Sequence, residues 1–238
     1  MRSTGFAVGF LALTVVTAVN GEYREITIEN GATITGQVRA TGEVPALPPQ
    51  TVFKQTEHCG TTVPDERLVV GKGGALANVV VYVTNVKAGK AAPLGQPVKL
   101  ENEKCRFVPH VVSATLGQTL AIHNGDPFLH DTHATLGSRT LFNVGILSGH
   151  TVKQPLLEAG MIDLNCNVRH TWMHGYAFVA EHTYHAVTDA EGRFRIDNLP
   201  GGQWTLRAWH EMLGSTDREV RVMPGEARDV EINLQGGE

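Results

Sequence analysis

Short segments in which apolar and polar residues alternate, each bounded by a turn rich in glycine or proline, recur along this chain. Residues 31–40 place Ile34 and Val38 on one side of an extended segment, and the proline-rich turn 45–49 follows them. Residues 77–83 are apolar on both faces, which is typical of a strand buried inside a sheet. Together with 26 glycines and 11 prolines, this pattern favours an all-β fold over a helical bundle.

The same pattern returns near the C-terminus. The turns 189–192 and 200–202 each lead into a segment in which apolar residues alternate with polar ones. With the two alternating segments that follow, the expected strands are 193–196, 204–209, 220–222 and 230–234.

The composition is that of a globular protein with enough apolar residues for one or two modest cores, since 42% of the residues are hydrophobic and 18% are charged. The formal net charge is −4, and no run of five or more basic residues occurs, so we expect no nucleic acid partner. The sequence shows no phosphate-binding loop, nucleotide fingerprint, paired-carboxylate site or Ser-His-Asp order. It therefore gives no sign of the enzyme classes that use them.

The longest apolar stretch lies at the N-terminus, where Arg2 precedes residues 6–19. This stretch is shorter than the roughly 20 residues of a spanning helix, and small residues precede a plausible cleavage point after Gly21. We therefore expect residues 1–21 to be a signal peptide; an uncleaved anchor is the alternative. The mature protein would begin at about Glu22, with no further membrane segment, in the periplasm or outside the cell.

Three cysteines in an exported protein are an odd number, which suggests one disulfide and one thiol with another use. Cys59 and Cys105 lie in no ligand-like pattern beyond the neighbouring His58, so we expect them to pair. In the chain-entropy model, closing a loop of about 45 residues stabilises a fold by about 4 kcal/mol. Cys166 remains as the free thiol.

The surroundings of Cys166 indicate a metal site. Nine of the eleven histidines lie in the segment that runs from His110 to His185. Within it, Cys166, His170 and Met173 form a Cys-x3-His-x2-Met loop followed by an apolar strand. A thiolate, an imidazole and a thioether on one loop suit copper, whereas a thioether adds little to a zinc site.

Four short patterns lie upstream of the Cys166 loop. They are Phe107-x-Pro109, Gly117-x-x-Leu120, Asn124-x-Asp126 and His130. Their order, followed by the Cys166 loop, resembles a cupredoxin, and residues from about 100 to 181 look like a plastocyanin-type domain. The resemblance implies a Greek-key β-sandwich with copper near one end.

Carried onto this sequence, the resemblance implies His130 and His170 as the imidazole ligands, Cys166 as the thiolate and Met173 as the weak axial ligand. The spacings of three and two residues depart from plastocyanin-like loops and are similar to half of a binuclear copper A loop. The first cysteine of that motif would fall at Ile162. We therefore expect one copper ion per chain.

The roles of other residues near this pattern stay open. His133 and His110 are either additional ligands or hydrogen-bonding partners of the site, and His133 could also face outward. Asn167 and Trp172 either direct N–H groups at the sulfur and exclude water, or serve ordinary packing. The remaining histidines of the segment are expected on the surface or in packing: His123, His150, His174, His182 and His185.

The outer segments resemble the carboxypeptidase regulatory-like, or transthyretin-like, sandwich. Residues 31–38, 77–83 and 188–206 carry its pattern, with Trp204 in place of the usual tyrosine. Since about a hundred residues separate its two halves, we expect a discontinuous sandwich of residues 22–99 and 182–238, with a cupredoxin-like domain at 100–181 inserted. Proteins with this pairing are often labelled methylamine utilization proteins, which implies a redox context.

The favoured interpretation is a carrier of single electrons that meets a redox partner protein, and not an enzyme. A copper storage or delivery protein is the first alternative. A small mononuclear copper enzyme is the second, and it would need an open coordination position, as if His133 replaced Met173. A metal-free module for adhesion or carbohydrate contact is the last.

Overall fold

The computed structural model describes residues 23–168 and 170–236. The expected signal peptide at 1–21 lies outside these residues. Within the part of the chain that is described, no helix is both long and apolar enough to cross a membrane. Apart from the short helix α1 (Thr56–Cys59) and the 3-10 turn η1 (Lys72–Gly74), the regular elements are strands, which confirms the all-β prediction.

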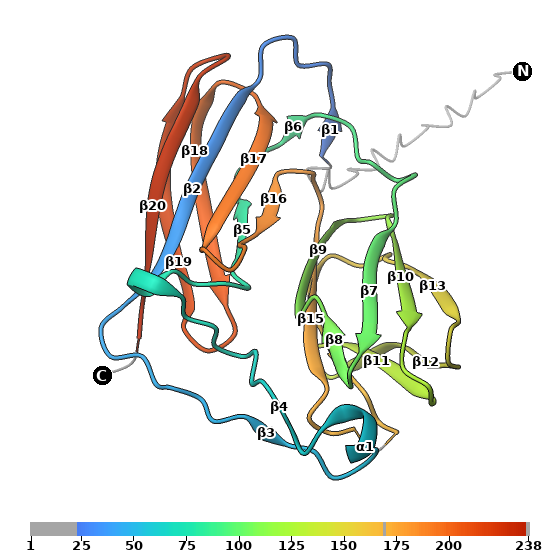
Figure 1. The fold of residues 1–238 in the computed structure, drawn as a ribbon. Helices are drawn as coiled ribbons and strands as arrows, with labels where there is room; N and C mark the ends of the chain where they lie inside the picture. The colour runs from blue at the N-terminus through green and yellow to red at the C-terminus, as the bar shows by residue number, and fades with distance from the viewer. Residues whose placement is uncertain (1–22, 169, 237–238) are drawn as a thin grey trace, which may run out of the picture.

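Strands from both ends of the chain form one β-sandwich, here called the terminal sandwich (Figure 1). One sheet has the order β16-β5-β18-β19, and the other has the order β17-β2-β20. The strands are β2 (Ala32–Thr41), β5 (Val80–Val83), β16 (His185–Val187), β17 (Arg193–Leu199), β18 (Gly202–His210), β19 (Gly214–Val222) and β20 (Ala227–Gln235). Ile34, Val81 and Leu206 lie fully buried between the two sheets.

The strands between β5 and β16 include a second pair of sheets, here called the middle sandwich (Figure 1). Its sheets have the orders β13-β10-β7-β8 and β12-β11-β14-β15-β9. The strands are β7 (Val98–Glu103), β8 (Arg106–Val108), β9 (Val111–Thr115), β10 (Thr119–Asn124), β11 (His130–Leu136), β12 (Arg139–Ile146), β13 (Thr151–Pro155), β14 (Gly160–Asn165) and β15 (His174–Ala180). Leu100, Leu120 and Leu164 are among its buried residues.

The two sandwiches pack directly on each other. A small apolar cluster between them joins Val80 of β5 to Val111 and Phe178 of the middle sandwich, and the rings of Tyr82 and Phe178 lie 4.5 Å apart. Val81, next to Val80, faces the terminal core. Because the middle sandwich covers the outer side of β5, this strand is apolar on both faces, as the sequence predicted.

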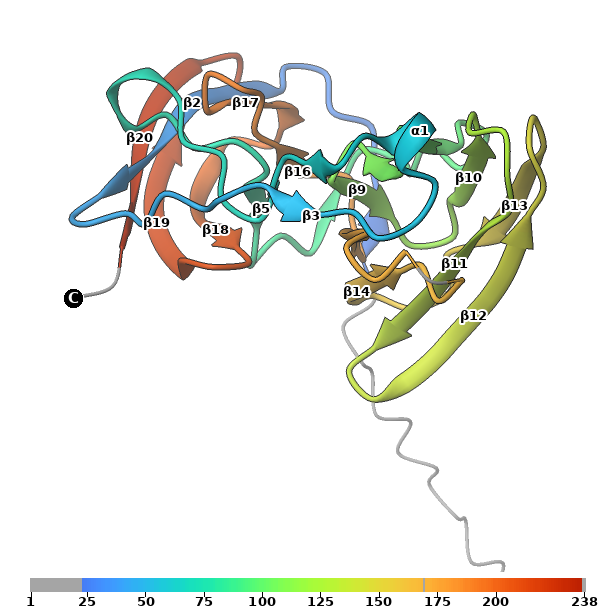
Figure 2. The ribbon, with the colours of Figure 1, turned by 60° about the horizontal axis from the view of Figure 1, so that its bottom comes forward.

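A segment from the N-terminal part of the chain closes one end of the middle sandwich. This capping segment, residues 50–63, consists of α1 flanked by the paired strands β3 (Gln50–Thr51) and β4 (Thr62–Val63) (Figures 1 and 2). Its Cys59 forms a disulfide with Cys105, which follows β7. Elsewhere β1 (Arg24–Glu25) pairs with β6 (Ala88–Gly89).

Candidate metal centre

Strand pairing brings the start of β11 and the loop between β14 and β15 to one end of a sheet. In the antiparallel ladder, His133 of β11 lies opposite Asn165 at the end of β14, and Asn165 lies opposite His174 at the start of β15. His130 begins β11, while Cys166 directly follows β14. The ladder therefore places the imidazole and the thiol close together although 36 residues separate them.

Three donor atoms form a compact triangle at this end. Cys166 Sγ lies 3.7 Å from His130 Nδ1 and 3.6 Å from His170 Nδ1, and the two nitrogens are 3.0 Å apart. The circle through these three atoms has a radius of about 2.0 Å, which is the length of a metal–imidazole bond. One ion at the centre of the triangle would thus be within bonding distance of all three donors.

The protons of both imidazoles are held away from this triangle. His130 Nε2 lies 2.8 Å from a carboxylate oxygen of Asp126, and His170 Nε2 lies 2.8 Å from Gln55 Oε1. Because carboxylate and amide oxygens only accept here, each Nε2 donates its proton and each Nδ1 keeps a lone pair. The two Nδ1 atoms lie 3.0 Å apart with their lone pairs directed into the triangle, an arrangement that suits a bound cation.

The donors are excluded from water, since His130, Cys166 and His170 are at most 2% exposed. Burial raises the pKa of the Cys166 thiol to about 12; the backbone N–H of Asp131 opposes this rise, and the Asp131 carboxylate adds to it. Burial, with His130 nearby, lowers the pKa of His170 to about 4. His170 is therefore neutral, and Cys166 becomes a thiolate only where a cation replaces its proton.

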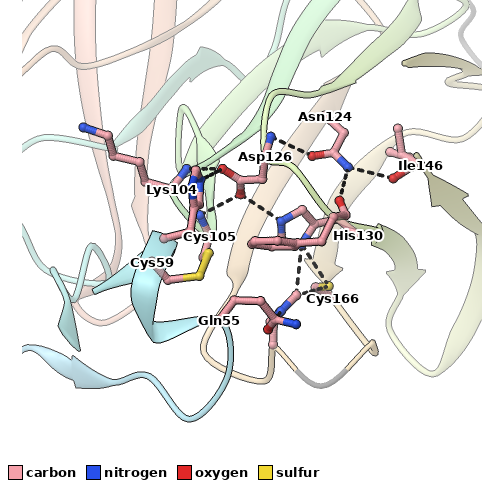
Figure 3. Close-up of polar contacts among 12 residues, drawn as sticks. Gln55, Cys59, Lys104, Cys105, Asn124, Asp126, His130, Ile146 and Cys166 are labelled. Carbon is pink, nitrogen blue, oxygen red and sulfur yellow. Dashed lines mark hydrogen bonds and ion pairs between the residues drawn. A yellow bond between two sulfur atoms is a disulfide. The ribbon is translucent and has the colours of Figure 1, made fainter. Parts of the chain in front are cut away.

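Asp126 organises the surroundings of His130 (Figure 3). Its carboxylate accepts hydrogen bonds from His130, from His58 of the capping segment, and from the backbone N–H groups of Lys104 and Cys105, each at 2.8 Å. Burial alone would raise the pKa of Asp126, but these hydrogen bonds hold it well below its ordinary value. The ionised carboxylate fixes the orientation and the tautomer of His130.

Asp131 fixes the loop that carries the thiol. Its Oδ1 accepts the backbone N–H groups of Asn167 at 2.6 Å and Val168 at 3.1 Å. The loop is closed further by the backbone N–H of Met173, which donates to the carbonyl of His170 at 2.8 Å. Asn167 therefore contributes to the loop through its backbone N–H, which donates to Asp131.

Met173 and Trp172 complete the buried end of the loop. Met173 is 1% exposed and belongs to the same apolar cluster as Cys166. The Trp172 ring centroid lies 5.2 Å from that of His170, and its indole N–H donates to the carbonyl of Cys105 at 3.0 Å. Trp172 therefore shields one side of His170 and links the loop to the disulfide.

Residues 177–235 match the family model of the carboxypeptidase regulatory-like domain. This region runs from β15 to β20 and includes the two turns singled out in the sequence. No curated protein sequence matches the chain.

Among solved structures, the chain is similar in part to cupredoxins. A purple cupredoxin from Nitrosopumilus maritimus is 19% identical, with a TM-score of 0.32 over 35% of this chain and 99% of that one. An amicyanin from Paracoccus versutus is 21% identical, with a TM-score of 0.32 over 42% and 96%. A copper-containing nitrite reductase from Thermus scotoductus is 21% identical, with a TM-score of 0.34 over 42% of this chain and 26% of that one.

Two of the histidines considered in the sequence lie away from the triangle. His133 is three residues after His130 on β11, so the strand turns it to the opposite face, where its Nε2 lies 2.8 Å from Thr140 Oγ1. His110 contacts Glu211 of the carboxypeptidase regulatory-like region, with 2.5 Å between Nε2 and Oε1. The structure brings neither imidazole into the donor triangle.

Sequence reasoning assigned no role to Asp126, His58 or Gln55. Asp126 stood in the Asn-x-Asp pattern four residues before His130, and His58 stood beside Cys59, so both carried a local signal. Gln55 carried none, because the fold of the capping segment alone brings it to His170. Its backbone is left-handed, with φ of 49°, which is uncommon for a residue other than glycine.

Proposed function

We propose that the protein binds one copper ion between His130, Cys166 and His170, with Met173 as a weak fourth ligand, and that it carries single electrons between partner proteins. The site would belong to a cupredoxin-like domain at 100–181, inserted into a sandwich of residues 22–99 and 182–238. The observation that carries the proposal is the triangle of two imidazole lone pairs and one thiol, with sides of 3.0 to 3.7 Å. Two imidazoles and a thiolate in one trigonal set, beside a methionine, are the donors of copper electron-transfer sites.

A bound copper ion would supply the one-electron change, and the residues of the chain would keep its surroundings constant. Asp126 and Gln55 hold the two imidazoles from their outer nitrogens, while Asp131 holds the backbone of the thiol loop. Donors restrained in this way change position little between oxidation states, which favours rapid electron transfer.

The burial of the donors supports a carrier over the alternatives. All three donor side chains are at most 2% exposed, and His133 faces away from them. A copper enzyme needs a position that substrate can reach, and a delivery protein needs an open route for the ion. Neither feature fits a site closed by the capping segment and by Trp172.

A hollow on the surface gives a partner access to the outer side of the site. It is lined in part by Gln55, His58 and Phe128. The Phe128 ring lies 5.2 Å from the ring of His130 and 5.6 Å from that of His170. An electron would therefore cross Phe128 or Gln55 between the imidazoles and a redox partner in this hollow.

The proposal is tested by the metal content and the visible spectrum of the protein after addition of Cu(II). We expect an intense thiolate-to-copper band that saturates at one equivalent of Cu(II) per chain and that Cys166→Ser abolishes. His133→Ala is the matched control and should retain both copper and band, because His133 lies outside the triangle. Copper without the band, or a band that survives in Cys166→Ser, would refute the assigned site. If the band is present, the identity of the fourth ligand is tested by the shift that Met173→Leu produces in it.

A further inference from the structure

A second group of metal-binding side chains lies where the two sandwiches meet. It consists of His110 between β8 and β9, His174 at the start of β15, and Glu211 after β18, whose ligand atoms all lie within 4.8 Å of one another. His110 Nε2 is 2.5 Å from Glu211 Oε1, and His174 Nδ1 is 3.7 Å from Glu211 Oε2. The side chains of His110 and Glu211 are 4% and 6% exposed, and that of His174 is 25% exposed.

The backbone holds each member of this group in place. The carbonyl of His110 accepts the N–H of Tyr176 on β15 at 2.9 Å, and His174 lies opposite Asn165 in the β14–β15 ladder. Glu211 lies in the tight turn between β18 and β19. In that turn, Nδ1 of the buried His210 accepts the N–H groups of residues 212 and 213 at 3.2 and 3.3 Å. The two imidazoles and the carboxylate thus converge from three separately fixed segments.

Neighbouring groups also suit a cation here. The second nitrogen of His174 lies 4.0 Å from a carboxylate oxygen of Asp163, which is too far for a hydrogen bond but places a negative charge near the group. Two guanidinium groups line the hollow beside this group, and each is paired with its own acid, Arg67 with Asp65 at 2.6 Å and Arg106 with Glu66 at 3.1 Å. The carboxylate of Glu211 is therefore left to balance the charge of an ion.

We propose that His110, His174 and Glu211 form a second metal site, which takes a divalent ion such as Zn²⁺ and joins the two sandwiches. Two imidazoles and one carboxylate are a known zinc donor set that leaves the fourth position to water. This set lacks sulfur, so it prefers a harder ion than the donors around Cys166 do. Glu211 comes from the terminal sandwich and both histidines come from the middle one, so the bound ion would cross-link them.

The proposed zinc site shares no ligand with the copper site, although His174 directly follows Met173 in the chain. We would measure Zn²⁺ binding by calorimetry and by metal analysis after dialysis, in a Cys166→Ala background that removes the thiol of the other site. We expect one Zn²⁺ per chain. That ion should be lost in Glu211→Gln, whose amide keeps a hydrogen bond to His110 but lacks the charge, and in His174→Ala. His150→Ala is the matched control and should retain the ion, because His150 is exposed, lies outside this group and contacts the Ser148 carbonyl through its Nδ1.

Two further measurements make the result decisive. Far-UV circular dichroism establishes that each variant is folded, and His174→Ala alters a partly exposed side chain that the core does not need. Asp163→Asn should weaken zinc binding by less than about tenfold, because it removes a partly exposed negative charge 4.0 Å from His174. Zinc bound with unchanged stoichiometry and affinity in folded Glu211→Gln and His174→Ala would overturn the proposal, as would failure of the background protein to bind zinc.

Discussion

Replacing Asp126 by asparagine tests whether this buried carboxylate organises the candidate metal centre. The Asp126 carboxylate accepts four hydrogen bonds, two from imidazoles and two from backbone N–H groups. An amide of the same shape has one oxygen and an NH2 group that can only donate. Asp126→Asn therefore leaves at least two of the four donors without an acceptor.

The magnitude follows from these hydrogen bonds. A hydrogen bond to a charged group contributes about 1.5–3 kcal/mol, so the loss of two lowers the free energy of unfolding by about 3–6 kcal/mol. With copper bound, His130 also loses the negative partner of its Nε2. We expect weaker metal binding, by roughly 10–100-fold, and a higher reduction potential, because less negative charge remains to stabilise the oxidised ion.

Urea unfolding of the metal-free protein, followed by tryptophan fluorescence, measures the first effect, and a redox titration of the visible band measures the second. Asp217→Asn is the matched control. Asp217 pairs with Arg207 on the surface at 2.7 Å with both side chains 43% exposed, and such pairs contribute at most about 1 kcal/mol. If Asp126→Asn were no more destabilising than Asp217→Asn, the role assigned to Asp126 would be wrong.

Three other variants test a buried histidine, the disulfide and the core of the terminal sandwich. Burial lowers the pKa of His185 to about 4 from an ordinary 6.5, so its neutral form stabilises the fold. Because the unfolded chain binds the proton more tightly, His185 alone should lower the stability by about 3 kcal/mol as the pH drops from 6.5 to 4, and His185→Gln should remove this contribution to the slope in urea titrations. Replacing both Cys59 and Cys105 by alanine should cost about 4 kcal/mol of unfolding free energy, and an unchanged urea midpoint would contradict this. Leu206→Ala opens a cavity in the terminal core and should cost about 2–5 kcal/mol in urea unfolding while the copper band keeps its position.

The strands were predictable because alternation along a strand is a local property. Ile34 and Val38 reveal their buried face through their spacing alone, and β5 reveals burial on both faces through a run of valines. The donor loop was equally visible, since Cys166 and His170 are four residues apart and their proximity needs only a turn.

The contacts around these donors were not predictable in the same way. Gln55 reaches His170 across 115 residues of sequence, and Glu211 reaches His110 across 101. Such contacts depend on how the capping segment and the two sandwiches pack, which no local spacing encodes. Histidines such as His174, expected on the surface or in packing, acquire charged neighbours only through this packing.

The capping segment also limits what can be transplanted from this protein. An excised stretch of residues 100–181 would carry His130, Cys166 and His170, but it would lose Gln55 and the disulfide partner of Cys105. The Nε2 atom of His170, which contacts Gln55 in the intact protein, would then be exposed to water. The smallest fragment that keeps the whole candidate site is therefore the middle sandwich together with residues 50–63. A circular permutant or fusion that separates these two parts should differ from the parent protein in its metal affinity.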